Sequence, residues 1–249
     1  MERLKQKVAI VTGGGNGIGR AISEVFAEEG ARVVVADIDT QAGNNVVDEI
    51  VRKGGDAVFC QADVGSPEDA PRVVSVAAGS GGRIDVLCNN AAYLTDWHSI
   101  LESTSEEWEH AIRVNLMGVH YLTKAVLPYM LEQKQGSIIN IASIQALIGL
   151  PASVAYTSMK AALLGYTISA AFDYGRQNVR VNAICPGSIQ TRISPKPGEP
   201  HYFYQCEQTM LGRVGYPREI GYAALFLASE EASFITGAVI TVDGGRVAR

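Results

Sequence analysis

The stretch that most constrains the fold is an apolar run that ends in glycines and continues as a helix. Residues 7–12 have the short, apolar character of a buried strand. The glycine-rich residues 13–19 follow, and after them Ile22, Val25 and Phe26 recur on one helical face. A strand, a glycine-rich turn and a helix N-terminus together bring backbone N–H groups and a positive dipole to one point, which favours an anion. This stretch therefore predicts the phosphate-binding turn of an α/β nucleotide-binding domain.

A carboxylate follows the second apolar run, residues 32–36, which ends in Asp37. At this place in such a domain a carboxylate holds the adenosine ribose hydroxyls and repels a 2′-phosphate. Neither Asn16 nor Ile38 offers a compensating cation, and Arg20, at the helix start, is expected to face solvent. The pattern favours NAD over NADP. The alternative for Asp37 is a turn residue that only closes its strand.

The alternation of strands and helices continues to the C-terminus. Further strands are predicted at residues 57–61, 84–88, 136–142 and 179–185, and further helices at 40–53, from Ser66 on, at 104–131 and at 155–174. Ser66 is the expected N-cap of its helix, with Pro67 at the first position, and Thr104 opens a capping box. This order predicts one α/β domain over residues 1–249, with a parallel sheet, helices on both faces and right-handed crossovers.

Composition excludes several classes of protein. The chain has 249 residues, 47% of them hydrophobic, and a net charge of −5, which argues against general nucleic-acid binding. No apolar run has the length of a membrane span. The cysteines have no Cys-x-x-Cys spacing and the histidines no ligand spacing, so we expect a reducing, cytoplasmic location and no metal site; these residues are Cys60, Cys88, Cys185, Cys206, His98, His110, His120 and His201.

The clearest chemical signal is the pair Tyr156 and Lys160 in the helical run 155–174. Residues four apart lie on one face of a helix, so the phenol and the ammonium are expected to point the same way. Bringing a tyrosine pKa from about 10 to about 7 requires roughly 4 kcal/mol of preference for the phenolate. One positive charge about 4 Å away supplies an interaction of that order. The pair is therefore a candidate acid/base catalyst near neutral pH.

Residues 194–211 interrupt the regular alternation. They contain three prolines and then the aromatic residues Tyr202, Phe203 and Tyr204. The composition predicts a loop with at most a short helix, placed after the carboxyl end of a strand, where open α/β sheets bind ligands. We expect a substrate lid. An ordinary surface loop or an oligomer contact is the alternative.

Taken together, these motifs resemble the short-chain dehydrogenase/reductase family, in its compact single-domain subtype, over essentially the whole chain. Each motif is weak alone, but their order is specific. The matching motifs are Thr-Gly-x-x-x-Gly-x-Gly at residues 12–19, an Asp-Val at 63–64, Asn-Asn-Ala-Ala at 89–92, the tetrad Asn115, Ser143, Tyr156 and Lys160, Pro-Gly at 186–187, and the ending at 236–245. Ala92 departs from the glycine that is usual in the family.

The resemblance implies a doubly wound Rossmann-type domain with a mostly parallel seven-stranded sheet, and a homotetramer. It implies that Tyr156 is the general acid/base, that Lys160 lowers its pKa and binds the nicotinamide ribose, that Ser143 binds the substrate oxygen and that Asn115 orients a water. The implied NAD contacts are Gly13, Asn16, Gly17, Ile18, Gly19, Asp37, Ile38, Asp63, Val64, Asn90, Ala91, Tyr156, Lys160, Pro186, Gly187, Ile189 and Thr191; the implied substrate contacts are Ser143, Gln145 and Tyr156.

The sequence thus predicts hydride transfer between NAD(H) and a secondary alcohol or ketone, with polyols, sugars and hydroxysteroids all open. The candidate wall residues of the substrate site are Gln145, Leu150, Pro151, Tyr93, Trp97, His98, Tyr202 and Tyr204. One alternative is an NADPH-dependent reductase of 3-oxoacyl groups on a carrier protein, against which Asp37 and the acidic balance count. The other is a non-catalytic NAD-binding regulator, against which the complete tetrad counts.

Overall fold

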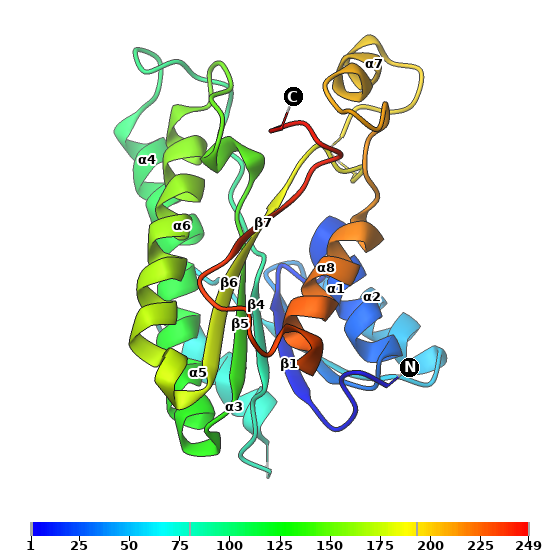
Figure 1. The fold of residues 1–249 in the computed structure, drawn as a ribbon, viewed down its shortest axis with the longest axis vertical. Helices are drawn as coiled ribbons and strands as arrows, with labels where there is room; N and C mark the ends of the chain where they lie inside the picture. The colour runs from blue at the N-terminus through cyan, green and yellow to red at the C-terminus, as the bar shows by residue number, and fades with distance from the viewer. Residues whose placement is uncertain (1, 80, 193, 249) are drawn as a thin grey trace.

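Seven strands build the centre of the molecule. The computed structural model describes residues 2–79, 81–192 and 194–248. The strands are β1 (Val8–Thr12), β2 (Arg32–Asp37), β3 (Asp56–Gln61), β4 (Val86–Asn89), β5 (Gly136–Ile141), β6 (Val179–Pro186) and β7 (Val239–Val242). They form one sheet in the order β3-β2-β1-β4-β5-β6-β7, and the neighbouring strands pair in parallel (Figure 1). The predicted seven-stranded sheet is confirmed.

Helices cover both faces of this sheet. They are α1 (Gly17–Glu28), α2 (Thr40–Arg52), α3 (Asp69–Ala78), α4 (Ser105–Ile112), α5 (Gly118–Gln133), α6 (Val154–Tyr174), α7 (Pro200–Glu207) and α8 (Pro217–Ala228). Helices α1, α2 and α8 lie on one face, and α4, α5 and α6 on the other (Figure 1). The fold is therefore doubly wound, as the alternation predicts. None of the helices in the described part of the chain is long and apolar enough to span a membrane.

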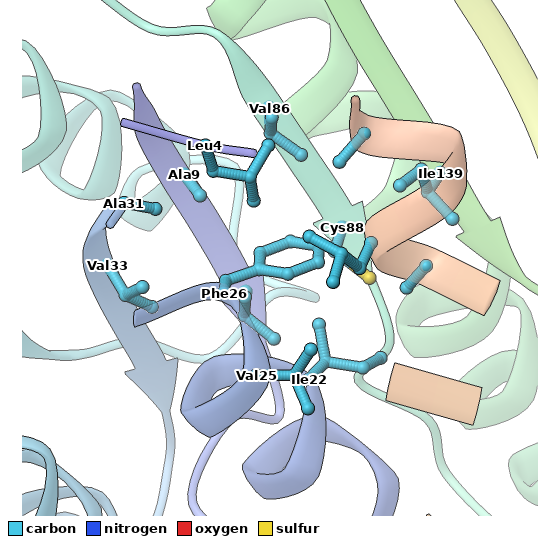
Figure 2. Close-up of a cluster of buried hydrophobic side chains, with 14 of the residues drawn as sticks. Leu4, Ala9, Ile22, Val25, Phe26, Ala31, Val33, Val86, Cys88 and Ile139 are labelled. Carbon is cyan, nitrogen blue, oxygen red and sulfur yellow. The ribbon is translucent and has the colours of Figure 1, made fainter. Parts of the chain in front are cut away.

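The two faces of the sheet have separate apolar cores. Successive side chains of a strand point to opposite faces, so Ala9 and Val11 of β1 pack with Phe26 on the α1 and α8 side. Ile10 packs instead into the core on the α3 and α5 side. Figure 2 shows the fully buried Phe26 among the side chains of the first core. Burial on both faces explains why the strands are continuous apolar runs rather than alternating ones.

The functional edge of the sheet is fixed by its topology. Strand β1 leads into α1 on one face, whereas its neighbour β4 leads towards the helices of the other face. The connections therefore diverge between β1 and β4, and open α/β sheets bind ligands at the carboxyl ends of strands beside such a point. Gly13, Asn90, Ser143 and Gly187 follow the ends of β1, β4, β5 and β6.

Of the two predicted helix N-caps, one is wrong and one is confirmed. The predicted N-cap Ser66 is wrong, because α3 begins at Asp69 with Glu68 as its N-cap. Ser66 instead forms a turn, in which its carbonyl accepts the Asp69 N–H at 3.2 Å and its hydroxyl donates to Glu68 Oε2 at 2.8 Å. The predicted N-cap Thr104 is confirmed, since its hydroxyl accepts the Glu107 N–H at 3.1 Å.

The predicted long helix over residues 104–131 is interrupted at Asn115. A π-helical segment, Arg113–Met117, joins α4 to α5. Segments of this kind are rare and occur mostly at functional sites, because one extra residue per turn re-aims the side chains. Here the irregular turn carries a member of the predicted tetrad, Asn115, which is fully buried.

Candidate active site

A cavity of about 860 Å³ opens at the carboxyl ends of the strands. Most residues expected to contact cofactor or substrate line it; they are Gly13, Asn16, Gly17, Ile18, Asp37, Ile38, Asp63, Val64, Asn90, Ala91, Ser143, Tyr156, Lys160, Pro186, Gly187, Ile189 and Thr191. Gly19, Asn115 and Gln145 do not line it. The fold thus brings together residues from almost the whole length of the chain.

The glycine-rich turn forms one end of the cavity. Gly13 and Gly17 have φ angles of 59° and 53°, in the left-handed region that favours glycine. A Cβ on Gly13 would also lie 2.9 Å from the Cα of Ala91. Gly19 lies behind the turn, where a Cβ would collide with the carbonyl of Gly13, so its absent side chain permits the packing of α1. The first turn of α1 has no acidic residue and no side-chain cap, which leaves its N–H groups available to an anion.

Asn90 ties the glycine-rich turn to the end of β4. Its side-chain amide donates to the carbonyls of Thr12 and Gly13 at 2.9 and 3.1 Å. The Thr12 hydroxyl in turn accepts the backbone N–H groups of Asn90 and Ala91 at 2.9 and 3.0 Å. This reciprocal set of hydrogen bonds fixes the two strand ends relative to each other. The Asn-Asn-Ala motif therefore shapes the cavity as well as lining it.

Asp37 lies directly beside the glycine-rich turn. Its Oδ2 accepts the Gly15 N–H at 2.8 Å and its Oδ1 accepts the Asp39 N–H at 3.0 Å. The carboxylate is buried, yet it reaches the cavity wall. Arg20 does not line the cavity, because Glu24 and Glu49 hold its guanidinium at 2.9 and 2.6 Å. The acidic end of the cavity is therefore not neutralised by the nearby arginine.

Asp63 has a partner that sequence reasoning missed. Arg113, at the start of the π-helical segment, donates to Asp63 Oδ2 at 2.7 Å, and the Gly65 N–H donates to Oδ1 at 2.9 Å. Burial alone would raise the pKa of Asp63, but the hydrogen bonds from Arg113 and Gly65 and the nearby positive charge together outweigh it, and the pKa is lowered. Arg113 also lines the cavity. No local pattern signals this ion pair, since its members are far apart in sequence.

The predicted catalytic residues converge at the other end of the cavity. Tyr156 and Lys160 lie on one face of α6, and Ser143 follows the end of β5. The Lys160 ammonium is buried, lies 5.6 Å from the centre of the Tyr156 ring and donates to the Ile141 carbonyl at 2.8 Å. The Ser143 hydroxyl accepts the Gln145 N–H at 3.1 Å. The helical spacing therefore orients phenol and ammonium together, as predicted.

A buried polar chain holds this end of the cavity in place. The Asn89 amide donates to Asn140 Oδ1, and the Asn140 amide donates to the Thr167 hydroxyl, both at 2.9 Å. The three residues belong to β4, β5 and α6 and are almost inaccessible to solvent. Satisfied buried networks of this kind specify one arrangement of the elements that they join. These hydrogen bonds set the position of α6 against the sheet.

The pKa values correct one expectation. Burial raises the pKa of Tyr156 to about 12, and contact with Ser143 only partly opposes the rise. Burial also lowers the pKa of Lys160 to about 8. The predicted lowering of the Tyr156 pKa by Lys160 is therefore not found, because desolvation of the phenolate dominates while the Lys160 ammonium donates to the Ile141 carbonyl.

Asn115 and Gln145 have structural partners instead of places on the cavity wall. The Asn115 amide donates to the Tyr93 carbonyl at 2.9 Å, and its Oδ1 accepts the Tyr93 N–H at 2.8 Å. Gln145 Oε1 accepts the hydroxyls of Ser153 and Thr157 at 2.7 and 3.0 Å. Gln145 thus does not line the cavity, and its expected contact with substrate stays a prediction. Asn115 positions Tyr93, which does line the cavity.

The wall residues expected of the substrate site are only partly found. Tyr93 and Trp97 line the cavity, whereas Leu150, Pro151, His98, Tyr202 and Tyr204 do not. The additional residues that sequence reasoning missed include Leu94, His110, Arg192, Pro195, His201 and Gln205. The pair His201 and Gln205 had a usable signal, namely its four-residue spacing behind Pro200 at a helix start. The predicted lid over residues 194–211 does contain a short helix, α7; residue 193, directly before it, lies outside the described residues.

The cavity suits a nicotinamide dinucleotide. The glycine-rich turn, with free helix N–H groups and no room for side chains at Gly13, is a cradle for a diphosphate. Asp37 lies where ribose hydroxyls are bound in this topology. Tyr156 and Lys160 stand at the opposite end, where the reactive ring of such a cofactor would lie beside Ser143. The order of these groups along one cavity matches the order of groups in the cofactor.

Comparisons with known proteins agree with this geometry. A family model described as enoyl-(acyl carrier protein) reductase matches residues 13–246. A 3-oxoacyl-(acyl-carrier-protein) reductase of Thermotoga maritima is 38% identical over 245 residues, which are 98% of this chain and 99% of that protein. A cyclohexanol dehydrogenase of Acinetobacter sp. strain SE19 is 37% identical, with 97% and 95% covered. A cyclopentanol dehydrogenase of Comamonas testosteroni is 36% identical, with both chains fully covered.

A solved structure has the same fold. The crystal structure of gox2181 superimposes with a TM-score of 0.94 at 34% sequence identity, over 99% of this chain and 98% of that chain. The similarity in sequence and in fold thus extends over the whole domain, from the glycine-rich turn to the C-terminal strand. The chain belongs to the short-chain dehydrogenase/reductase family of oxidoreductases.

Proposed function

We propose that this chain is an NAD-dependent dehydrogenase/reductase that transfers a hydride between NAD(H) and a secondary alcohol or ketone. The observation that carries the proposal is the arrangement of one cavity. Ser143, Tyr156 and Lys160 line one end of it, and Asp37, whose carboxylate accepts backbone N–H groups, lines the other. The first group suits a carbinol oxygen, and the second suits an unphosphorylated ribose.

Each residue has a distinct part in the proposed reaction. Ser143 donates a hydrogen bond to the substrate oxygen and so orients the carbinol carbon. Tyr156 accepts the hydroxyl proton during alcohol oxidation and returns it to the carbonyl oxygen during ketone reduction. A bound nicotinamide ring supplies the hydride acceptor or donor. Lys160, buried next to Tyr156, favours the phenolate once a ligand turns its ammonium away from Ile141.

The coenzyme preference rests on Asp37. Both of its oxygens are held by backbone N–H groups, so the carboxylate has a fixed position at the cavity wall. A 2′-phosphate placed there would meet a negative charge, and Arg20 is already bound by two glutamates. Ribose hydroxyls would instead donate to the carboxylate. This supports NAD rather than NADP as the coenzyme.

A reductase of 3-oxoacyl groups is the second candidate. It is favoured by the similarity to the Thermotoga maritima reductase of that name, at an identity close to that of the cycloalkanol dehydrogenases. Such an enzyme is expected to use NADPH and to need a basic docking face, whereas this chain carries Asp37 and a net charge of −5. A non-catalytic regulator gains no support, since Ser143, Tyr156 and Lys160 are all in place.

A coenzyme assay separates these candidates. The purified chain is incubated with NAD or NADP and a set of secondary alcohols, and in the other direction with NADH or NADPH and acetoacetyl-thioester or simple ketones. The proposal expects reduction of NAD by alcohols. Preferred oxidation of NADPH by the acyl thioester would instead establish the reductase.

Oligomeric state and location stay predictions. We propose a homotetramer, for which the support beyond resemblance is the exposed apolar surface of α6, where Ile168 and Phe172 are 56% and 88% exposed. Light scattering of the purified protein tests this, and a monomer at micromolar concentration would contradict it. The expected cytoplasmic location is supported only by free cysteines, and cell fractionation tests it.

A further inference from the structure

The substrate end of the cavity has two walls of opposite character. One wall comes from the loop after β4 and presents Tyr93, Leu94 and Trp97. The other comes from α7 in the lid and presents His201 and Gln205. The first is largely aromatic and apolar, and the second is polar. A substrate that contacts both walls must therefore have two different kinds of surface.

The aromatic wall is anchored close to Tyr156. His98 forms a backbone bridge with Ser153, three residues before Tyr156, and its Nδ1 lies 3.0 Å from Glu107 Oε2. Trp97 directly precedes this anchor, so its backbone lies near the reacting end of the cavity rather than near the glycine-rich turn. An anchored loop is a suitable platform for recognising a ring.

Trp97 is the open aromatic surface of that wall. Tyr93 is already covered, because the ring of His110 stacks on it with centres 4.1 Å apart. Trp97 is 66% exposed although it lines the cavity. An open indole face on a binding site has a large apolar area to offer to a flat or ring-shaped ligand.

The polar wall consists of side chains that have no hydrogen-bond partner. His201 and Gln205 are four residues apart, on one face of α7. Within residues 2–79, 81–192 and 194–248, neither side chain has a hydrogen bond or ion pair, and His201 only stacks against Tyr204 with ring centres 5.8 Å apart. An imidazole and a carboxamide together offer several donors and acceptors to a ligand.

The other side chains of α7 also show that the helix turns its polar face towards the cavity. The aromatic residues Tyr202, Phe203 and Tyr204 do not line the cavity, although they are the apolar residues of the helix. An apolar substrate would be better served by the opposite orientation. The lid instead turns its polar face inward, where an unpaired polar group has a cost once water is excluded.

We infer that the substrate is a polyhydroxylated ring, such as a cyclic polyol or a sugar, rather than an apolar cyclic alcohol. This inference rests on the proposed function, since the reacting carbinol is placed at Ser143 and Tyr156. The C–H face of the ring packs on Trp97, and hydroxyls away from the reacting carbon bond to His201 and Gln205. His201 and Gln205 are thereby specificity-determining residues.

The test measures a ratio of specificity constants. For the wild type, kcat/KM is determined with NAD for cyclohexanol, cyclohexane-1,2-diol, myo-inositol and a set of aldopyranoses. The best polyhydroxylated ring is expected to exceed cyclohexanol at least about tenfold, because each hydroxyl satisfies an otherwise unpaired polar group. The double variant His201→Phe with Gln205→Leu is expected to reduce that ratio about tenfold or more.

Two further variants make the test specific. Phe203→Leu changes the same helix on a face away from the cavity and is expected to leave the ratio unchanged. His201→Gln keeps hydrogen-bonding capacity and is expected to keep most of the ratio. The inference is overturned, while the proposed function stands, if the wild type prefers cyclohexanol or if the ratio of specificity constants is unchanged in the double variant. Absence of turnover with every alcohol and ketone contradicts the proposed function itself.

Discussion

The reacting end and the lid side of one cavity are built in contrasting ways. At the reacting end Lys160 and Asn115 are buried and hydrogen-bonded to backbone groups, and the chain from Asn89 through Asn140 to Thr167 lies beneath them. On the lid side His201 is exposed and its side chain has no hydrogen-bond partner among the described residues. The reacting groups are thus supported by buried, hydrogen-bonded residues, whereas the residues expected to recognise the substrate lie on an exposed segment.

This difference teaches where substitution has consequences. A buried hydrogen-bonded group fixes the geometry of its neighbours, so its loss affects rate and stability together. An exposed polar group on a lid affects which ligand is preferred, with little effect on folding. The four predictions below concern cavity residues and the buried contacts that support them, from the largest expected effect to the smallest.

Tyr156→Phe removes the proton-transferring hydroxyl. General acid/base catalysis contributes about 10²–10⁴-fold, so we expect kcat to fall by that factor while the NADH dissociation constant changes by less than about twofold. Steady-state kinetics and NADH fluorescence titration measure the two quantities. Tyr166→Phe, on the same helix but away from the cavity, is the control. A Tyr156→Phe enzyme of normal kcat would disprove the acid/base assignment.

Lys160→Met tests the burial of the ammonium. The pKa of Lys160 is lowered from 10.5 to about 8 in the folded chain. Between these values the unfolded chain binds more protons, so the wild-type free energy of unfolding rises with pH across this window. Relative to the variant, the wild type is expected to gain about 3 kcal/mol between pH 7.5 and 10.5.

Urea unfolding of both proteins at several pH values measures this difference. If the unfolding free energies of the two proteins changed with pH in parallel, the ammonium would not be desolvated in the folded chain. The informative quantity is the slope of unfolding free energy against pH. The absolute difference also contains the bond from Lys160 to the Ile141 carbonyl, which the variant lacks at every pH.

Asn115→Ala tests the link between the π-helical segment and the substrate wall. It leaves the N–H and the carbonyl of Tyr93 without partners, at an expected cost of about 2 kcal/mol in unfolding free energy, and it raises KM more than it lowers kcat. Chemical unfolding and kinetics are the measurements. Asn44→Ala, which removes one exposed bond to Thr40, is the control and should change stability by less than about 0.5 kcal/mol. Equal stability losses in the two variants would contradict the proposed positioning role.

Asp37→Ser tests coenzyme selection. The change removes the charge that opposes a 2′-phosphate, so we expect the ratio of kcat/KM for NAD over NADP to fall about tenfold. Asp39→Ser removes an adjacent carboxylate that caps α2 and keeps a capping hydroxyl, so its ratio should stay at the wild-type value. If the two variants behave alike, the effect is general electrostatics and not ribose recognition.

The sequence predicts those features of this molecule that depend on neighbours in the chain. The glycine-rich turn and the alternation of strands and helices follow from local pattern. The common face of Tyr156 and Lys160 follows from helical spacing. The parallel pairing of the strands and a ligand site at their carboxyl ends follow from the doubly wound topology.

The features that the sequence could not predict depend on contacts between distant segments. Arg113, at the start of the π-helical segment, meets Asp63 in the turn that follows β3, a contact between segments 50 residues apart. The pKa of Tyr156 depends on whether burial or charge dominates, which spacing cannot tell. The inward face of α7 likewise depends on how the lid packs, so Tyr202 and Tyr204 were predicted as wall residues and do not line the cavity, whereas His201 and Gln205 do.

The most direct test of the account is the coenzyme-resolved rate of the wild-type chain. Initial rates of NADH and NADPH formation are measured with secondary alcohols, cyclic polyols and sugars under identical conditions. The account predicts NADH formation with at least one of these alcohols, with a kcat/KM for NAD at least about tenfold above that for NADP. Equal or greater efficiency with NADP would contradict the role given to Asp37 and with it the central claim that one cavity joins an NAD site to a secondary-alcohol site.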